Sequence, residues 1–140
     1  MGKPKILFLC TTNSARSQMA EVFLRKYGGE KFEAYSAGFE PKAIHPFTKR
    51  VMEEVGILLT GQDSKSFREY MGKVHFAYLI TVGAEAEKNC PTTFPGIGQR
   101  LHWSFEDPAA FQGSEEEKIA KFRQVRDKIE QRIVEWLKKQ

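Results

Sequence analysis

The sequence predicts an α/β fold built on a parallel sheet, and two observations support this class. Short apolar or alternating segments typical of strands are separated by segments with the apolar spacing of helices. Parallel strands require such connecting helices, because the chain must return to the same end of the sheet before the next strand begins. With 140 residues, the chain has the length of a single domain, residues 1–140, and is large enough to bury a core.

Four strands are expected in this sheet. Residues 5–9 contain an uninterrupted apolar run and predict a strand buried on both faces. Residues 32–37 predict a second strand, which Gly38 ends. Apolar side chains alternate along residues 74–82 and predict a third strand, and residues 101–105 predict a fourth.

Three helices are expected between and after these strands. Residues 14–27 predict a helix that ends at the glycine pair 28–29, and residues 46–55 predict one with a proline in its first turn and Gly56 as its stop. Residues 114–138 carry apolar side chains at helical spacing and predict a long helix packed on the core. The remaining segments, residues 60–66 and the Pro/Gly-rich residues 90–98, predict a polar rim loop and an irregular loop.

The segment from Cys10 to Ser17 contains the candidate nucleophile and the candidate anion-binding groups. It lies between the first predicted strand and helix, which is where open α/β sheets bind ligands. Main-chain N–H groups and the helix dipole favour the thiolate of Cys10, the nucleophilic form, although a strand-end cysteine is also commonly just a buried residue. The same N–H groups bind tetrahedral oxyanions, and Arg16 adds a bidentate clamp. The predicted oxyanion loop comprises Thr11, Thr12, Asn13, Ser14, Ala15, Arg16 and Ser17.

This segment resembles the phosphate-binding loop of the low-molecular-weight protein tyrosine phosphatase superfamily, and more narrowly that of the thioredoxin-coupled arsenate reductase family. Residues 17–21 (SQMAE), 35–38 (YSAG), 89–91 (NCP) and 102–110 (HWSFEDPAA) carry the same resemblance, which therefore spans nearly the whole chain. With the strand and helix order, it implies a flavodoxin-like three-layer α/β sandwich with a four-stranded parallel sheet. It implies thiol-dependent reduction of arsenate to arsenite, with hydrolysis of phosphate monoesters through a phosphocysteine as the alternative.

Chemistry at a tetrahedral oxyanion also needs an acid for the leaving oxygen, and Asp107 is the candidate. It follows a predicted strand, so in a parallel sheet it lies at the same edge as Cys10. An Asp-Pro pair is also a common turn signal, and the resemblance is what favours the acid. Ser17 can donate a hydrogen bond to the Cys10 thiolate, or simply begin the helix.

Reduction of a cysteine-bound arsenate requires a second thiol, which supplies electrons by attacking the first. The resemblance implies a relay through two further cysteines seven positions apart, of which Cys90 matches the later and Gly83 stands at the earlier. Three interpretations stay open. Cys90 attacks Cys10 directly through a mobile loop; a small thiol such as glutathione, mycothiol or bacillithiol serves as reductant; or the chain is an engineered or degenerate form. The external thiol reductant is expected to be thioredoxin, glutaredoxin with glutathione, mycothiol or bacillithiol. Phosphatases of the superfamily usually place aromatic residues after the Asp-Pro pair, whereas Ala109 and Ala110 follow here, which favours a naked oxyanion.

Charge and composition restrict the classes of molecule that the protein is expected to bind. A formal net charge of +4 suits a small anion such as arsenate, with phosphate or sulfate competing, whereas no basic stripe with interleaved aromatic residues predicts nucleic-acid binding. Two cysteines and three isolated histidines predict no disulfide framework, metal site or bound cofactor, although the resemblance implies a possible alkali cation near Asn13, Glu21 and Ser36. Without a signal peptide or membrane-length apolar run, we expect a monomeric cytoplasmic protein.

Overall fold

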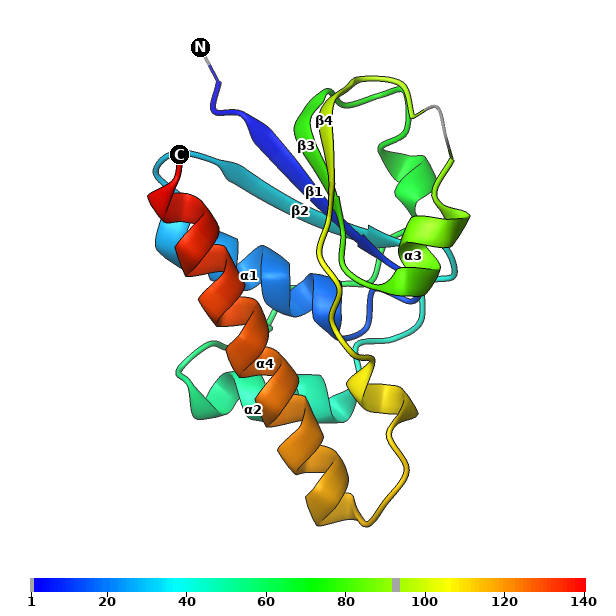
Figure 1. Cartoon of the computed structure of the whole chain (residues 1–140), viewed down its shortest axis with the longest axis vertical. Coiled ribbons are helices and arrows are strands. Elements are labelled where there is room, and N and C mark those ends of the chain that lie inside the picture. Colours follow the sequence, from blue (N-terminus) through cyan, green and yellow to red (C-terminus); the bar gives the residue numbers. More distant parts are fainter. Residues whose placement is uncertain (1, 92–93) are drawn as a thin grey trace.

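The structure, a computed structural model, describes residues 2–91 and 94–140. Its sheet contains the four strands β1 (Lys5–Cys10), β2 (Glu33–Gly38), β3 (Phe76–Thr81) and β4 (Ile97–His102). All pairings are parallel, and the strand order is β2-β1-β3-β4 (Figure 1). The predicted α/β class and the four-stranded parallel sheet are therefore confirmed.

Four α-helices connect or follow the strands: α1 (Arg16–Gly28), α2 (Pro46–Glu54), α3 (Ala84–Asn89) and α4 (Glu115–Lys138). Proline begins α2, as expected, and His45 Nδ1 accepts a hydrogen bond from the Phe47 N–H at its start. Helix α4 begins with a reciprocal capping box between Ser114 and Glu117, which fixes the start of the long helix predicted over residues 114–138. Two 3₁₀ turns, η1 (Phe67–Glu69) and η2 (Pro108–Ala110), complete the elements.

Two predictions about elements were wrong. Strand β4 begins at Ile97 and ends at His102, not at residues 101–105, because an edge strand with largely exposed side chains has no apolar run to mark its start. Helix α3 was not predicted, since only Ala86 of its six residues is buried and no apolar periodicity reveals it. Within the predicted irregular loop 90–98, residues 92–93 lie outside the described residues.

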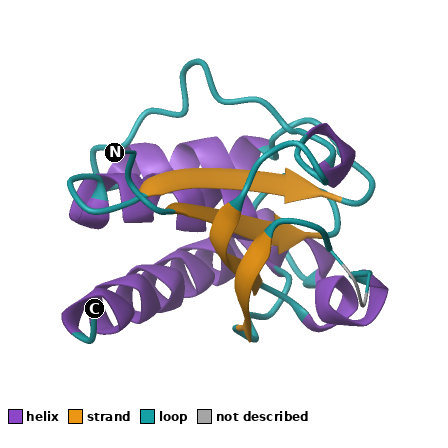
Figure 2. Ribbon diagram, turned by 90° about the horizontal axis from the view of Figure 1, so that it is seen from above, coloured by secondary structure: helices purple, strands orange, loops and turns teal. Residues whose placement is uncertain are grey.

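The sheet separates two apolar clusters. Helices and loops pack around the sheet (Figure 2). Side chains alternate along β1, so Ile6, Phe8 and Cys10 belong to the cluster under α1 and α4, whereas Leu7 and Leu9 belong to the opposite one. The first cluster receives the buried stripe of α4 that the sequence predicted. The second is closed by residues of η1, β3 and the segment after α3. Cys10 and Cys90 therefore lie in different clusters on opposite faces of the sheet.

Parallel pairing brings the carboxyl ends of the strands to one edge. Cys10 pairs with Gly38 across β1 and β2, and Thr81 pairs with His102 across β3 and β4. Gly38 allows a close approach there, because a Cβ at this position would lie 2.8 Å from the Asn13 nitrogen. The loops that follow β1, β3 and β4 consequently meet beside the start of α1.

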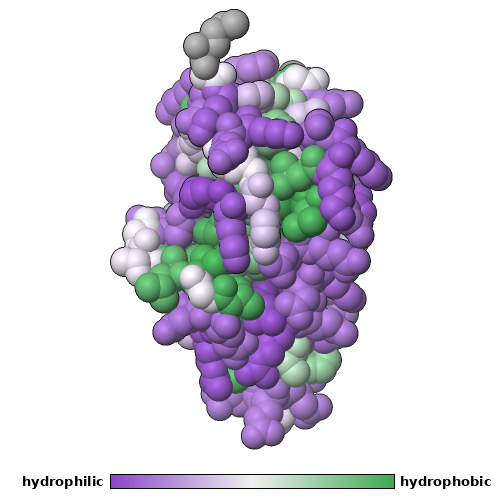
Figure 3. Space-filling view, turned by 90° about the vertical axis from the view of Figure 1, so that its left-hand side faces the viewer, coloured by the Kyte–Doolittle hydropathy of each residue, from purple (hydrophilic) through white to green (hydrophobic). Residues whose placement is uncertain are grey.

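The face of the molecule shown in Figure 3 is mostly hydrophilic, with limited apolar areas. Among the described residues, the large apolar side chains that remain exposed are Tyr27 and Leu58. Over the same part of the chain, every helix is too short or too polar to cross a membrane.

Candidate active site

The thiol of Cys10 lies at the point where β1 ends and a tight loop leads into α1. Its sulfur accepts a hydrogen bond from the Asn13 N–H at 3.1 Å and lies 2.8 Å from the Ser17 hydroxyl. Asn13 turns its N–H back toward the sulfur because its backbone is left-handed, with φ of 53°, a region that asparagine tolerates better than most residues. The loop therefore surrounds the Cys10 sulfur with donors.

Asn13 also orients the Ser17 hydroxyl. Its side-chain Nδ2 donates to Ser17 Oγ at 2.7 Å. With its oxygen accepting that bond, Ser17 has its own hydrogen to direct at the Cys10 sulfur. The side-chain oxygen of Asn13 accepts in turn from Gln18 Nε2 at 3.0 Å and from the Lys65 N–H at 2.9 Å, which fixes the amide orientation.

Hydroxyl groups line the rest of the loop. Thr12 and Ser14 are hydrogen-bonded to each other at 2.7 Å. Thr11 Oγ1 is buried and has no hydrogen-bond partner within the described residues. Buried hydroxyls are normally paired, so this group is suited to donate to a bound anion.

Arg16, the first residue of α1, reaches across to the loop that follows β4. Its Nη1 donates to the Phe105 carbonyl at 3.1 Å, and its Nη2 lies 3.8 Å from Asp107 Oδ2. Only 11% of the Arg16 side chain is exposed. The guanidinium thus lies between the oxyanion loop and the candidate acid, where it can bind an anion held over Cys10.

Asp107 combines the two roles that the sequence left open. Its Oδ1 accepts a hydrogen bond from the Ala109 N–H at 3.0 Å and so caps η2, while Oδ2 points toward Arg16. The side chain is 45% exposed, which leaves it able to exchange protons with water. Nearby His45 has a lowered pKa, because its partial burial disfavours the imidazolium more than the Asp107 charge favours it.

Cys90 is the one predicted catalytic residue that lies apart from this site. It is 7% exposed and packs in the second cluster with Leu79 and Phe94. Burial raises the pKa of its thiol, against the opposing effect of the Arg100 charge. Arg100 also donates to the Pro91 carbonyl at 2.7 Å, which holds the chain just after Cys90.

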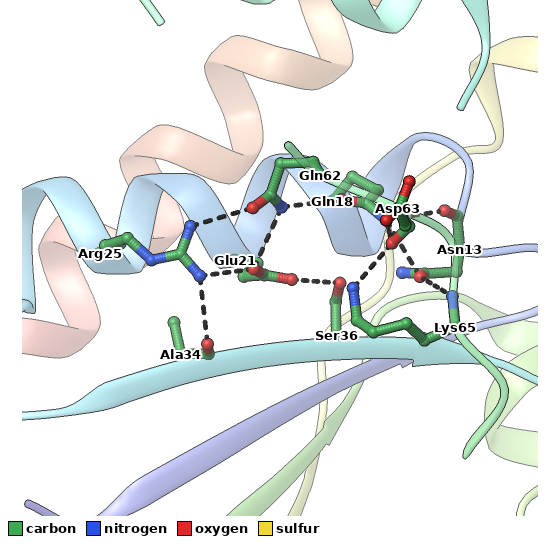
Figure 4. Close-up of polar contacts among 9 residues, drawn as sticks. All are labelled: Asn13, Gln18, Glu21, Arg25, Ala34, Ser36, Gln62, Asp63 and Lys65. Carbon is green, nitrogen blue, oxygen red and sulfur yellow. Dashed lines mark hydrogen bonds and ion pairs between the residues drawn. The ribbon is translucent and has the colours of Figure 1, made fainter. Parts of the chain in front are cut away.

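A buried polar network packs against the oxyanion loop (Figure 4). Glu21 Oε2 accepts from Arg25 Nη2 at 2.5 Å and from Gln62 Nε2 at 3.1 Å, and its other oxygen accepts from the Ser36 hydroxyl. Arg25 therefore brings a positive charge to the place where the resemblance implies an alkali cation. Both carboxylate oxygens of Glu21 are already engaged by protein donors.

Sequence reasoning missed two residues of this network. Gln18 is fully buried, and its amide donates to the Asn13 and Asp63 carbonyls at 3.1 and 3.0 Å. Gln62 lies in the segment 60–66 that was predicted only as a polar rim loop, and it links that segment to Gln18 and Glu21. The available signal was a polar residue at a core-facing position of α1, which usually means a buried hydrogen-bond network.

A strand–loop–helix unit that combines a cysteine, main-chain donors and an arginine is typical of α/β proteins that bind oxyanions and use a cysteine nucleophile. The chain belongs to the low molecular weight phosphotyrosine protein phosphatase family, whose model matches residues 5–140.

Several curated relatives of this chain are named arsenate reductases. One from Oceanobacillus iheyensis is 46% identical over 134 residues, covering 95% of this chain and 94% of the relative. One from Bacillus subtilis is 42% identical over 132 residues, covering 94% and 93%. Among solved structures, an arsenate reductase in the phosphate-binding state has a TM-score of 0.81 at 31% identity, covering 97% of this chain and 98% of its own. A thioredoxin-dependent arsenate reductase from Corynebacterium glutamicum has a TM-score of 0.71 at 28% identity, covering 98% and 61%.

Proposed function

We propose that this protein reduces arsenate to arsenite with electrons from thiols, and that Cys10 is the nucleophile. The observation that carries the proposal is the Cys10 sulfur, held by the Asn13 N–H and the Ser17 hydroxyl at the start of a helix. The arsenate reductases named above match almost the whole chain, which supports arsenate as the substrate.

The first step is addition of the anion to sulfur. Arg16 and the main-chain N–H groups of the oxyanion loop bind the arsenate oxygens, and the Cys10 thiolate attacks arsenic. A sulfur–arsenic bond forms as an arsenic–oxygen bond breaks, and the departing oxygen leaves as water. Asp107 donates the proton to that oxygen, because its free carboxylate oxygen faces Arg16 and therefore the bound anion.

The second step transfers electrons. A second thiolate attacks the Cys10 sulfur, a disulfide bond forms, and the electron pair of the sulfur–arsenic bond stays on arsenic. Arsenic passes from the +5 to the +3 state and leaves as arsenite, while two thiols become one disulfide. A further thiol equivalent then reduces that disulfide and regenerates Cys10.

We propose that the second thiol comes from a separate molecule. The chain contains two cysteines, and Cys90 is buried on the opposite face of the sheet from Cys10. An internal disulfide requires Cα atoms within about 7 Å and sulfur atoms that face each other, whereas Cys90 packs in the second cluster, on the other face of the sheet from Cys10. A low-molecular-weight thiol or a thioredoxin that reaches Cys10, itself 2% exposed, from the side of the oxyanion loop does not require Cys90 to leave the second cluster.

Arsenite release tests the proposal. The purified chain is given arsenate with thioredoxin, with glutaredoxin plus glutathione, or with mycothiol or bacillithiol, and Cys10→Ser serves as the control. We expect arsenite from the parent chain with at least one reductant and none from the control. Hydrolysis of an aryl phosphate is followed in parallel. Absence of arsenite with every reductant, together with Cys10-dependent hydrolysis, would assign the site to phosphate esters instead.

A further inference from the structure

Gln18 is a buried polar residue of α1 that no step of the proposed reaction uses. It is fully buried, so an amide without hydrogen-bond partners there would destabilise the fold. Its Nε2 donates to Asn13 Oδ1 at 3.0 Å and to the Asn13 and Asp63 carbonyls at 3.1 and 3.0 Å. Its Oε1 accepts from Gln62 Nε2 at 3.1 Å (Figure 4). The amide therefore links the oxyanion loop to the segment 60–66.

Main-chain groups determine which way the Gln18 amide points. The Asn13 and Asp63 carbonyls can only accept hydrogen bonds, so the nitrogen of Gln18 must face them. An amide rotated by half a turn would place Gln18 Oε1 against both carbonyl oxygens, with no hydrogen between them. That arrangement would bury unpaired acceptors, which is strongly unfavourable. The orientation of Gln18 is thus fixed by its surroundings.

The Gln18 amide in turn helps to fix the side chain of Asn13. Gln18 Nε2 and the Lys65 N–H both donate to Asn13 Oδ1, at 3.0 and 2.9 Å. With its oxygen held by two donors, Asn13 presents Nδ2 to the Ser17 hydroxyl, at 2.7 Å. Ser17 has one hydrogen, and because its oxygen accepts from Asn13, that hydrogen is directed at the Cys10 sulfur, 2.8 Å away. In the opposite orientation, Asn13 Oδ1 would compete for the Ser17 hydrogen, and the sulfur would lose a donor.

We infer that Gln18 is a positioning residue for the Cys10 nucleophile and acts through Asn13; for arsenate turnover, this role rests on the proposed function. Gln18 holds the Asn13 amide so that the Ser17 hydroxyl donates to the sulfur. A thiolate that accepts this hydrogen bond is stabilised, so more of the nucleophilic form is present at a given pH. The segment 60–66 takes part in the same control, since it supplies hydrogen-bond partners of both Gln18 and Asn13.

Gln18→Met tests this role, because methionine has a similar length and no side-chain N–H group. Alkylation of Cys10 by iodoacetamide is followed against pH on the Cys10 peptide by mass spectrometry. We expect the midpoint of the rate–pH curve to move upward by about one pH unit, a tenfold change in the ratio of thiol to thiolate. Protection of Cys10 by inorganic phosphate should be unchanged, since Arg16 and the main-chain N–H groups of the oxyanion loop remain.

Thr48→Val is the matched control. Thr48 is also fully buried, and its hydroxyl donates to the Ser14 carbonyl of the oxyanion loop at 2.9 Å rather than to Asn13. Valine has nearly the same shape but lacks this hydrogen bond, so the melting temperature should fall while the midpoint of Cys10 alkylation stays that of the parent.

Gln18→Ala is the second variant, should methionine prevent folding. The polar cavity that alanine leaves can admit water, which hydrogen-bonds the freed carbonyls and preserves the fold. Water both donates and accepts, so it does not impose the orientation of Asn13, and the midpoint of Cys10 alkylation should rise in this variant as well.

A double-mutant cycle with Ser17→Ala separates positioning from a general structural effect. If Gln18 acts through the Ser17 hydrogen, Gln18→Met should lower the melting temperature in both backgrounds but move the alkylation midpoint only in the parent. An equal shift in both backgrounds, a shift of the same size in Thr48→Val, or an unchanged midpoint in both Gln18 variants would overturn the inference. Alkylation needs no arsenate turnover, so a parent chain that releases no arsenite would refute the proposed function alone.

Discussion

The hydroxyl of Ser17 lies 2.8 Å from the Cys10 sulfur while its oxygen accepts a hydrogen bond from the Asn13 amide at 2.7 Å. The buried Ser17 hydroxyl therefore links the Asn13 side chain to the Cys10 sulfur through two hydrogen bonds. Its removal has two consequences, because the sulfur loses a donor and the amide loses an acceptor.

Ser17→Ala should slow both arsenite release and alkylation of Cys10 by iodoacetamide. A hydrogen bond to a charged group is worth about 1.5–3 kcal/mol, which corresponds to a roughly 10- to 100-fold loss of rate. Ser104→Ala is the control, since Ser104 is exposed. Unchanged alkylation of Cys10 in Ser17→Ala would show that Ser17 only begins α1.

Asp107→Asn should lower kcat by roughly 10²- to 10⁴-fold with little effect on KM, because an acid acts in the transition state. Asparagine also caps helices well, so the hydrogen bond from the Ala109 N–H is retained and the change isolates proton donation. A series of aryl phosphates measures the effect, which should grow as the leaving group becomes more basic. Equal rates for variant and parent across the series would leave Asp107 with its capping role alone.

Cys90→Ala should keep arsenite release within about twofold of the parent when an external thiol is the reductant. The reason is that Cys90 packs in the second cluster, away from the Cys10 sulfur. Mass analysis after one turnover without added thiol supplies the counterpart. A Cys10–Cys90 peptide that has lost two hydrogens would mean that the chain resolves its own intermediate and that the external-thiol proposal is incorrect.

Arg25→Met should lower the melting temperature by about 5 °C, because leaving the buried Glu21 carboxylate short of a charged donor costs about 2 kcal/mol. Lys26→Met removes the same charge from the exposed neighbouring position and is the control. Replacing choline with potassium in the buffer should stabilise Arg25→Met but not the parent. Stabilisation of the parent by potassium would place the alkali cation beside Asn13, Glu21 and Ser36 in addition to the arginine.

Glu54→Gln should lower the melting temperature at pH 7 by roughly 3 °C, and this difference should vanish in acid. Hydrogen bonds from Arg123, and then from Arg126, lower the pKa of Glu54 from 4.5 to about 2. A carboxylate with a lowered pKa contributes its stability above about pH 4.5 and loses it as the pH falls toward 2. The carboxylate is partly exposed, so the effect is kept small. Glu53→Gln, at the exposed neighbouring position, should show no such pH dependence.

The strands with strong apolar patterns were predictable, because burial on both faces leaves an uninterrupted signal, as in residues 6–9 of β1. The start of β4 was not, since Gly98 and Gln99 sit at an exposed sheet edge where pairing, not side-chain burial, defines the strand. Helix α3 likewise depends on tertiary contacts of a single buried alanine.

The candidate site likewise contains residues whose proximity the sequence predicts and others whose proximity it does not. Cys10, Arg16 and Ser17 are close in sequence, so their proximity follows from one strand–loop–helix unit. Asp107 joins them only because parallel strands end at one edge of the sheet, and the sequence supported that inference through the strand pattern. Gln62 is hydrogen-bonded to Glu21, which lies 41 positions away in the sequence, and Arg16 lies beside Gly83, which is 67 positions away. Local sequence patterns do not predict contacts over such distances.

The burial of Cys90 also makes this thiol an internal reporter of motion. A reagent labels it only when the second cluster opens, so its labelling rate measures the free energy of that local opening without any introduced probe. Cys10, at the carboxyl end of β1, is 2% exposed, and the change in its labelling rate when phosphate is added reports occupancy of the oxyanion loop in the same experiment. Two peptides in one mass spectrum thus record, on a common time axis, whether anion binding at one face of the sheet rigidifies the other.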